Sequence, residues 1–129
     1  METEKIGYVD DSWNVGMRRV NKIIEEEEAN GYPAFATGMY TKLPDIVVFD
    51  YDPFITCGAF VPMVRVYEST NYKSPDFYIS RAKAERYLNT LLQFKCDKVM
   101  VVSFESNLLD GKEYFEKHGI EVQVRGYQD

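Results

Sequence analysis

Two short apolar runs constrain the fold of this chain more than any other feature. Residues 46–49 are apolar at every position, and residues 99–104 are interrupted only by Ser103. A strand with apolar side chains on both faces has to be covered on both sides, which is typical of a sheet that lies between layers of helices. The sequence therefore predicts an α/β domain in which a mixed β-sheet is flanked by helices.

The remaining elements are predicted from periodicity and from residues that favour helix ends. Apolar residues recur at helical spacing after a potential capping residue, Ser12, Ser80 or Asn107. The expected helices are residues 13–29, which end at Asn30-Gly31, residues 80–94, and residues 107–118, which end at Gly119. The expected strands are residues 6–9, 32–36, 46–49, 61–70, 76–79, 99–104 and 120–124. At 129 residues, the chain is predicted to form a single domain over 1–129.

The composition excludes several classes of protein. No signal-like segment opens the chain and no apolar run approaches 20 residues, so we expect a soluble, intracellular (cytoplasmic) protein without a membrane partner. Cys57 and Cys96 stand alone, which argues against a zinc site and favours two small apolar packing residues. The net charge of −6 opposes binding to a polyanion, so nucleic-acid binding requires a local basic patch. Four of the negative charges come from residues 25–28, which we expect on a solvated helix face.

Two acidic residues stand at the ends of neighbouring predicted strands. Asp45 comes directly before the run 46–49, and Glu68 lies near the end of the segment 61–70. Alternation places Glu68 on the same face as Val64, Val66 and Thr70. An acid on an apolar face is usually paired, protonated or bound to a metal. Two carboxylates at strand ends suit Mg²⁺, which can activate water against a phosphodiester.

The order of these residues resembles a known family. Pro44-Asp45 with its apolar strand, then Glu68-Ser69-Thr70, then the helix from Ser80 are similar to the core of the PD-(D/E)XK nucleases, which have the restriction-endonuclease-like fold. More narrowly, residues 12–104 resemble the small archaeal-type Holliday junction resolvases. The resemblance implies that Asp45 and Glu68 bind Mg²⁺ or Mn²⁺.

The resemblance also implies a catalytic lysine two residues after the glutamate, where this chain has Thr70. In some members of the family this lysine is displaced into the following helix, and Lys83 has a suitable position there. Lys73, in the preceding loop, is a less suitable alternative. The resolvases carry a further acid in the first helix, but Arg18 and Arg19 stand near its expected position.

The resemblance therefore predicts a Mg²⁺-dependent DNA endonuclease, with branched or viral DNA as candidate substrates, that acts as a homodimer. Its catalytic residues would be Asp45, Glu68 and Lys83. The cationic side chains expected to contact phosphates are Arg18, Arg19, Lys22, Lys73, Arg81 and Arg86. The alternative is a catalytically inactive, nuclease-like module that binds DNA or a protein.

Two further patterns have competing interpretations. Asp50 and Asp52 follow the run 46–49 and resemble the D-x-D motif of haloacid-dehalogenase-type phosphatases, but Phe54 departs from that motif. These acids are better explained as turn residues or as an additional contribution to the metal site. Trp13 and the ten tyrosines could stack on bases, although packing is the more common role of such residues.

Overall fold

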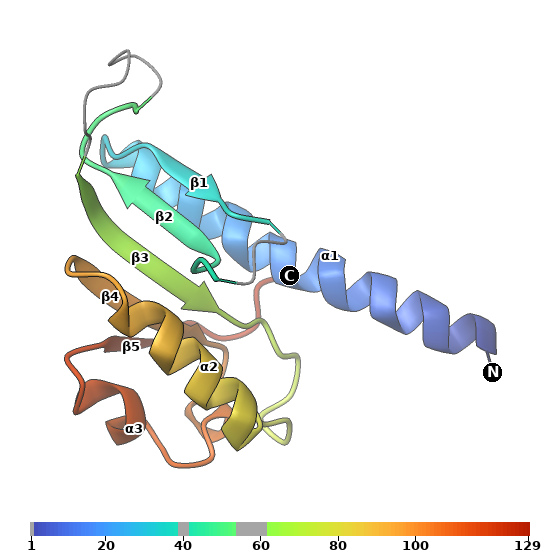
Figure 1. Ribbon diagram of the computed structural model, residues 1–129. Helices are drawn as coiled ribbons and strands as arrows, with labels where there is room; N and C mark the ends of the chain where they lie inside the picture. Colours follow the sequence, from blue (N-terminus) through green and yellow to red (C-terminus); the bar gives the residue numbers. More distant parts are fainter. Residues whose placement is uncertain (1, 39–41, 54–61) are drawn as a thin grey trace.

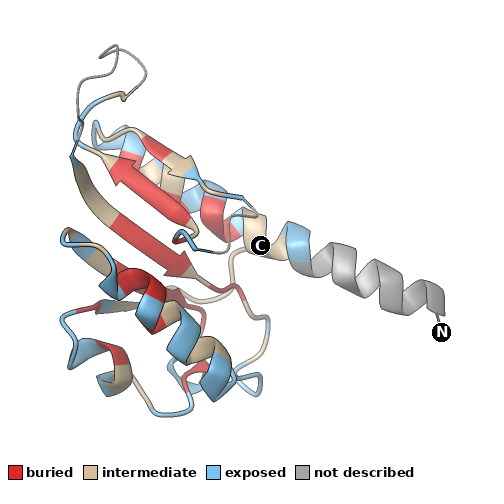
Figure 2. Ribbon diagram, viewed as in Figure 1, coloured by how far each residue is buried: buried red, intermediate tan, exposed pale blue. Residues whose placement is uncertain are grey.

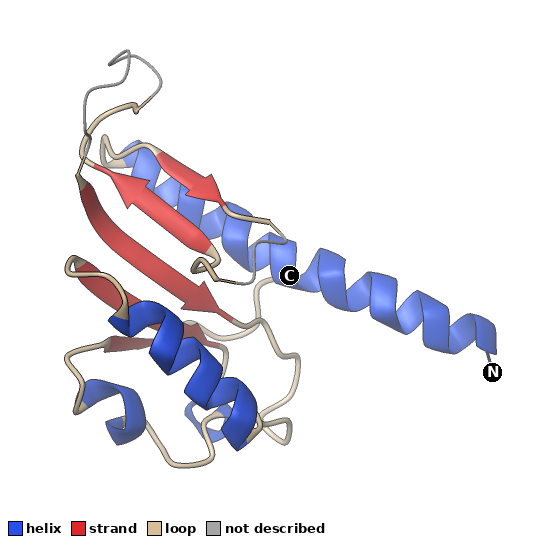
Figure 3. Cartoon of the chain, viewed as in Figure 1, coloured by secondary structure: helices blue, strands red, loops and turns tan. Residues whose placement is uncertain are grey.

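A computed structural model describes the backbone of residues 2–38, 42–53 and 62–129, and the side chains of these ranges from residue 13 onward. The helices are α1 (Glu2–Ala29), α2 (Arg81–Leu92) and α3 (Glu113–Glu116), with a 3₁₀ turn at Glu105–Asn107. The strands are β1 (Ala34–Ala36), β2 (Ile46–Phe49), β3 (Met63–Ser69), β4 (Asp97–Val102) and β5 (Glu121–Val124). They form one sheet in the order β1-β2-β3-β4-β5, shown in Figures 1 and 3. β1, β2 and β3 pair antiparallel, whereas β3, β4 and β5 pair parallel, which confirms the predicted α/β architecture with a mixed sheet.

The sheet separates two hydrophobic clusters. Val20 and Ile23 of α1 pack against one face, while α2 and α3 cover the other. β4 contributes to both clusters, because Val99 and Val101 face α1 whereas Met100 faces α2. Figure 2 shows the buried residues concentrated in the central strands and on the inner faces of the helices. The expectation that the apolar runs form strands buried on both faces is confirmed.

The helix ends agree with the sequence in part. Ser80 caps α2, since its hydroxyl accepts a hydrogen bond from the Lys83 backbone N–H at 3.2 Å. α1 ends where Gly31 adopts a φ of 92°, as the sequence predicts. The predicted strand 6–9 and the predicted cap at Ser12 are wrong, because α1 already begins at Glu2. Ile6, Val9 and Trp13 are three and four residues apart, which is helical rather than strand spacing.

The segment after β4 differs from the prediction. Asn107 does not cap a helix over 107–118, and the only α-helix in that described range is the short α3. The carboxamide of Asn107 instead accepts a hydrogen bond from the Phe104 N–H at 2.9 Å and donates to the carbonyls of Ser74 and Phe77 at 3.2 and 2.7 Å. Residues 76–79 form no strand, because their only β-type pairing is one isolated bridge between Ile79 and Leu108. Asn107 therefore links two loops that are about thirty residues apart in the chain.

The α1 side of the sheet holds a buried ion pair. Glu27 is 5% exposed and accepts hydrogen bonds from Arg65 Nε and Nη2 at 2.6 and 2.8 Å and from the Tyr67 hydroxyl. The prediction that residues 25–28 form a solvated face is therefore wrong at Glu27. A β-bulge in β3 leaves Val64 between the pairs Val48–Arg65 and Phe49–Met63, so Val64 packs on the α1 side rather than beside Glu68.

None of the helices in the described part of the chain is long and apolar enough to span a membrane.

Candidate functional site

The pairing of β2 with β3 brings the two predicted acids together. Ile46 pairs with Tyr67, so the next position of this antiparallel ladder places Asp45 across from Glu68. Alternation puts both side chains on the face that α2 covers, since Val47 and Val66 belong to that cluster. The two carboxyl groups thus lie at one edge of the sheet, where β2 begins and β3 ends.

Each acid is held by the backbone of the neighbouring strand. The Asp45 N–H donates to Glu68 Oε1 at 3.0 Å, and the Ser69 N–H donates to Asp45 Oδ2 at 3.0 Å. The two carboxyl groups also lie within hydrogen-bonding reach of each other. This reciprocal arrangement fixes both side chains before any ligand binds.

The environment of this pair disfavours two negative charges. Glu68 is 4% exposed, and burial, followed by the charge of Asp45, raises its pKa to about 9. Burial also raises the pKa of Asp45, while the hydrogen bond from Ser69 and the charge of Lys83 oppose that rise. Within the described ranges neither carboxylate forms an ion pair with a basic side chain. Such a pair can be neutralised by a shared proton or by a divalent cation.

Helix α2 places cationic and aromatic side chains beside the acids. Lys83 Nζ lies 5.7 Å from the ring centroid of Tyr87, which confirms the predicted neighbours four residues apart, and 6.0 Å from that of Tyr72. The charge of Lys83 acts on Asp45, and the charge of Arg86 acts on Glu68. Burial and the charges of the two acids raise the pKa of Tyr87. Lys83 therefore acts electrostatically on the acid pair from helix α2.

Thr70 occupies the position of the expected lysine and is bound to β4. Its N–H and its hydroxyl both donate to the Val101 carbonyl, at 2.9 and 3.4 Å. The side chain is 6% exposed, and it also lines a cavity.

This cavity has a volume of about 620 Å³. Neither Asp45 nor Glu68 lines it, but Lys83 and Tyr87, which interact electrostatically with the acids, do. It is bordered by the end of β3 and the loop that follows, by α2 and by α1. The lining residues are Val15, Gly16, Ser69, Thr70, Asn71, Tyr72, Lys73, Asp76, Phe77, Tyr78, Lys83 and Tyr87.

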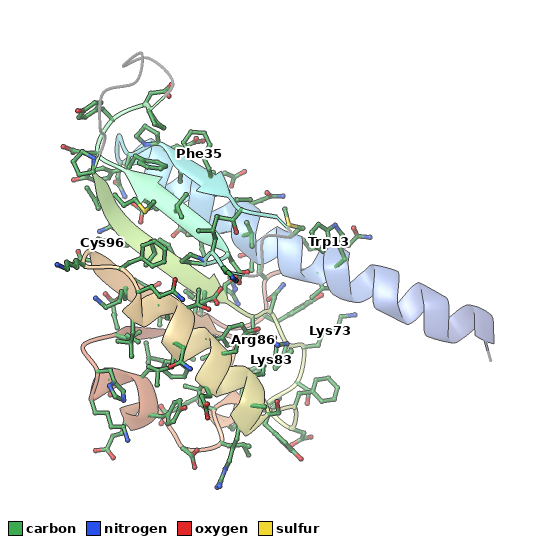
Figure 4. All side chains as sticks on the ribbon, viewed as in Figure 1. Trp13, Phe35, Lys73, Lys83, Arg86 and Cys96 are labelled. Carbon is green, nitrogen blue, oxygen red and sulfur yellow. The ribbon has the colours of Figure 1, made fainter. Side chains whose placement is uncertain are left out.

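Three of the predicted phosphate-binding residues, Arg18, Lys73 and Arg86, are exposed near this region, together with the half-buried Lys83 that was predicted to be catalytic. Figure 4 shows Lys73, Lys83 and Arg86 in one region beside α2. Arg18 belongs to the same region, because it donates to the Tyr127 hydroxyl at 3.1 Å while Lys73 Nζ lies 5.8 Å from the centroid of that ring. Two other predicted residues lie apart from this group. Lys22 is exposed on α1, and Arg81 pairs with Asp110 at 3.6 Å at the start of α2.

The prediction that Arg19 contacts phosphates is wrong for this structure. Its side chain is 1% exposed and donates to Asn71 Oδ1 at 3.2 Å, to Ser103 Oγ at 3.3 Å and to the Gly126 carbonyl. Burial lowers the pKa of its guanidinium. Arg19 thus joins α1 to the loop after β3 and to the C-terminal segment, and it presents no surface to a ligand.

Other sequence-based candidates lie outside the acid pair. Asp50 is exposed at the opposite end of β2, so it adds nothing to a metal site at Asp45. Among the described residues, no group of three or more His, Cys, Asp or Glu side chains is placed to hold a metal ion. Cys96 is free and half-buried, and Cys57 lies outside the described residues.

Sequence reasoning did not assign Tyr72 and Tyr87 to the site. Tyr87 was detectable, because it is one helical turn from Lys83. Tyr72 lies in a loop and has no periodic signal.

Comparisons of the chain with protein-family models, with curated proteins and with solved structures give no match.

Proposed function

We propose that this chain is a Mg²⁺-dependent DNA endonuclease of the PD-(D/E)XK type, with a restriction-endonuclease-like fold. The observation that carries the proposal is the pair formed by the buried Glu68 and the half-buried Asp45. Neighbouring strands hold the two carboxyl groups together through reciprocal hydrogen bonds of 3.0 Å, and no ion pair within the described ranges compensates them. Withdrawing two adjacent acids from water without a compensating cation costs stability, so such an arrangement is expected where it serves a function.

The donor set of this pair fits Mg²⁺ or Mn²⁺. Asp45 and Glu68 supply carboxylate oxygens, which hard divalent cations prefer. Mg²⁺ usually keeps several waters and uses only one or two protein carboxylates together with substrate phosphates, so a third protein acid is not required. When bound, the ion would lower the pKa of a coordinated water and neutralise charge that develops on the phosphate.

Lys83 has the role of the missing motif lysine in this proposal. The charge of its ammonium group acts on Asp45, and its side chain also lines the neighbouring cavity. There it can orient a water molecule or neutralise a phosphate oxygen through a charge-assisted hydrogen bond. Arg86 supplies a second positive charge near Glu68.

The local charge supports a nucleic acid as substrate despite the net charge of −6. The cationic side chains around the acid pair and the cavity are Arg18, Lys73, Lys83 and Arg86. Cations grouped in this way can neutralise successive phosphates, which is the main source of affinity for nucleic acids.

A cleavage assay tests the proposal. Wild-type protein is incubated with Mg²⁺ or Mn²⁺ and labelled junction, duplex or single-stranded DNA, in parallel with the variants Asp45→Asn and Asp50→Asn. Cleavage is expected from wild type and from Asp50→Asn, because Asp50 is an exposed acid at the other end of the same strand. Asp45→Asn is expected to be inactive. Absence of cleavage by wild type on every substrate, or equal cleavage by both variants, would contradict the catalytic role.

Thr70 favours a second candidate, a nuclease-like module that binds DNA without cleaving it. Threonine cannot provide the cation that the motif requires two residues after Glu68. This alternative predicts DNA binding that is unchanged by Asp45→Asn and no product with either metal ion. Metal-dependent cleavage by the wild type would exclude it.

A further inference from the structure

The cavity beside the acid pair has an aromatic lining. The rings of Tyr72, Phe77, Tyr78 and Tyr87 border it, and the rings of Tyr72 and Phe77 meet edge to face, at 6.2 Å and 85°. Two of these side chains remain largely in water, since Phe77 is 51% and Tyr78 60% exposed. Adjacent exposed aromatic residues at the border of a cavity are typical of a binding site.

The backbone that presents Phe77 and Tyr78 is fixed. Asn107 is 0% exposed and donates to the carbonyls of Ser74 and Phe77, while the Ile79 N–H donates to the Asn107 carbonyl at 2.8 Å. The Ser106 hydroxyl also donates to the Pro75 carbonyl, at 2.7 Å. The exposure of the two rings is therefore a property of an ordered loop. A ligand that stacks on them has little backbone entropy to overcome.

Cationic groups accompany the rings. Lys83 Nζ lies about equally far from the rings of Tyr72 and Tyr87, at 6.0 and 5.7 Å. Lys73 also lines the cavity and lies over the ring of Tyr127. The site thus combines flat apolar surfaces with two ammonium groups, and a nucleotide has the matching flat base and negative phosphate.

We infer that the cavity binds one unstacked nucleobase of a DNA strand, so that the proposed substrate carries an unpaired nucleotide next to the phosphate held at Asp45 and Glu68. The inference rests on the proposed function. The volume of about 620 Å³ lies within the range of small-ligand pockets. Ser69 and Thr70, which directly follow Glu68, and Lys83, whose charge acts on Asp45, all line the cavity, so the cavity adjoins the elements that hold the acid pair.

A base of duplex DNA can enter the cavity only if it leaves its partner and the neighbouring bases on which it stacks. Unstacking and unpairing cost a few kcal/mol, and this cost is absent for a single strand, a flap or an unpaired position at a junction. The structure therefore favours single-stranded or locally unpaired DNA over a continuous duplex.

Binding in EDTA tests this inference without cleavage. Fluorescence anisotropy compares labelled oligothymidylate, an abasic oligonucleotide of equal length and a fully paired blunt-ended duplex, which we expect to bind more weakly than oligothymidylate. The abasic strand has the same phosphates but no bases, and we expect it to bind about tenfold more weakly, since stacking contributes roughly 1–3 kcal/mol per base. Equal affinity for the two single strands would overturn the inference.

Three aromatic variants locate the contact. Phe77→Ala is expected to weaken binding of oligothymidylate about fivefold to tenfold, whereas Phe77→Trp retains it because indole also stacks. The matched control is Tyr51→Ala, which removes a 45% exposed ring beyond the end of β2 that lies opposite to Asp45. The inference is wrong if Phe77→Ala binds oligothymidylate as tightly as Tyr51→Ala does.

The inference and the proposed function fail in different ways. If wild type cleaves with Mg²⁺ but cuts continuous duplex as readily as single strands, the base site is excluded and the nuclease stands. If binding depends on bases and on Phe77 but no cleavage occurs, the base site stands and the catalytic proposal fails. Absence of binding to all three DNAs would overturn both.

Discussion

Replacing Glu68 with glutamine is expected to stabilise the metal-free protein at neutral pH. The folded protein holds Glu68 at a pKa of about 9, while the unfolded chain has the ordinary value of 4.5, so folding at pH 7 requires the uptake of a proton. At about 1.4 kcal/mol per pH unit, this uptake costs up to about 3 kcal/mol. Glutamine is neutral at every pH, and its amide can keep the hydrogen bond from the Asp45 N–H while donating to the Asp45 carboxylate.

The pH dependence has a defined sign. Because the folded pKa of Glu68 is raised, its contribution to stability is fully present below pH 4.5 and is lost as the pH rises toward 9. The stability difference between Glu68→Gln and wild type should therefore be near zero in acid and grow with pH.

Glu27 provides a matched control, for which the expected change in stability has the opposite sign. Its pKa is lowered by the hydrogen bonds from Arg65 and Tyr67 despite burial, so Glu27→Gln should destabilise at neutral pH and lose this effect as the pH falls below 4.5.

Urea unfolding in EDTA at several pH values between 4 and 8.5 measures both effects. We expect Glu68→Gln to increase the free energy of unfolding by about 1–3 kcal/mol at pH 7. Mg²⁺ should then raise the melting temperature of wild type more than that of the variant, because the variant has lost a carboxylate ligand. A variant that is less stable than wild type at pH 7, or a difference that is independent of pH, would refute the reasoning about the acid pair.

The remaining predictions concern catalysis, the buried arginine and the loop contact. Lys83→Met should reduce cleavage about 100-fold or more, and Thr70→Lys in the same chain should restore part of it; unchanged cleavage by Lys83→Met would exclude the displaced lysine. Arg19→Met should lower the free energy of unfolding by about 3 kcal/mol in a urea titration, because it removes a buried donor from several acceptors. Replacing the exposed Arg18 with alanine should change this free energy by less than about 0.5 kcal/mol. Equal effects of the two substitutions would contradict the buried role of Arg19. Asn107→Ala should lower stability by about 1–3 kcal/mol and increase amide exchange over residues 74–79, and unchanged exchange there would show that another contact orders the loop.

The central strands β2 and β4 and the shared face of the two acids were predictable, because local sequence determines them. A run with apolar residues at every position has few alternatives to a doubly covered strand, and the alternation of β2 and β3 places Asp45 and Glu68 on one face. The cap at Ser80 and the spacing of Lys83 and Tyr87 are equally local.

The errors arise where distant contacts determine the outcome. Arg19 looks like a surface cation of an amphipathic helix, but its partners Asn71, Ser103 and Gly126 are 52 to 107 residues away in the chain. Asn107 is a strong capping residue by type, yet its carboxamide is used by a loop about thirty residues earlier. Helical spacing alone contains no information about such partners.

The net charge of −6 is not the charge that a DNA strand would meet at the cavity. On the α1 side, Glu26 pairs with Arg125 at 2.8 Å and Glu27 pairs with Arg65 at 2.6 Å, so part of the acidic run is compensated within the protein. Of the described cations that form no ion pair, Arg18, Lys73, Lys83 and Arg86 lie around the cavity. Electrostatic attraction to phosphates is then a local effect that ionic strength should weaken in proportion to the cations involved.

The salt dependence of binding tests this arrangement. If Arg18, Lys73, Lys83 and Arg86 each neutralise one phosphate of a single strand, the logarithm of the association constant should fall with the logarithm of salt concentration at a slope of about −3. Lys73→Ala should reduce the magnitude of that slope by about 0.7. Lys95→Ala removes an exposed lysine beyond the other end of α2 and should leave the slope unchanged. Equal slopes for the two lysine variants would show that DNA is attracted by the overall charge and not by this group of cations.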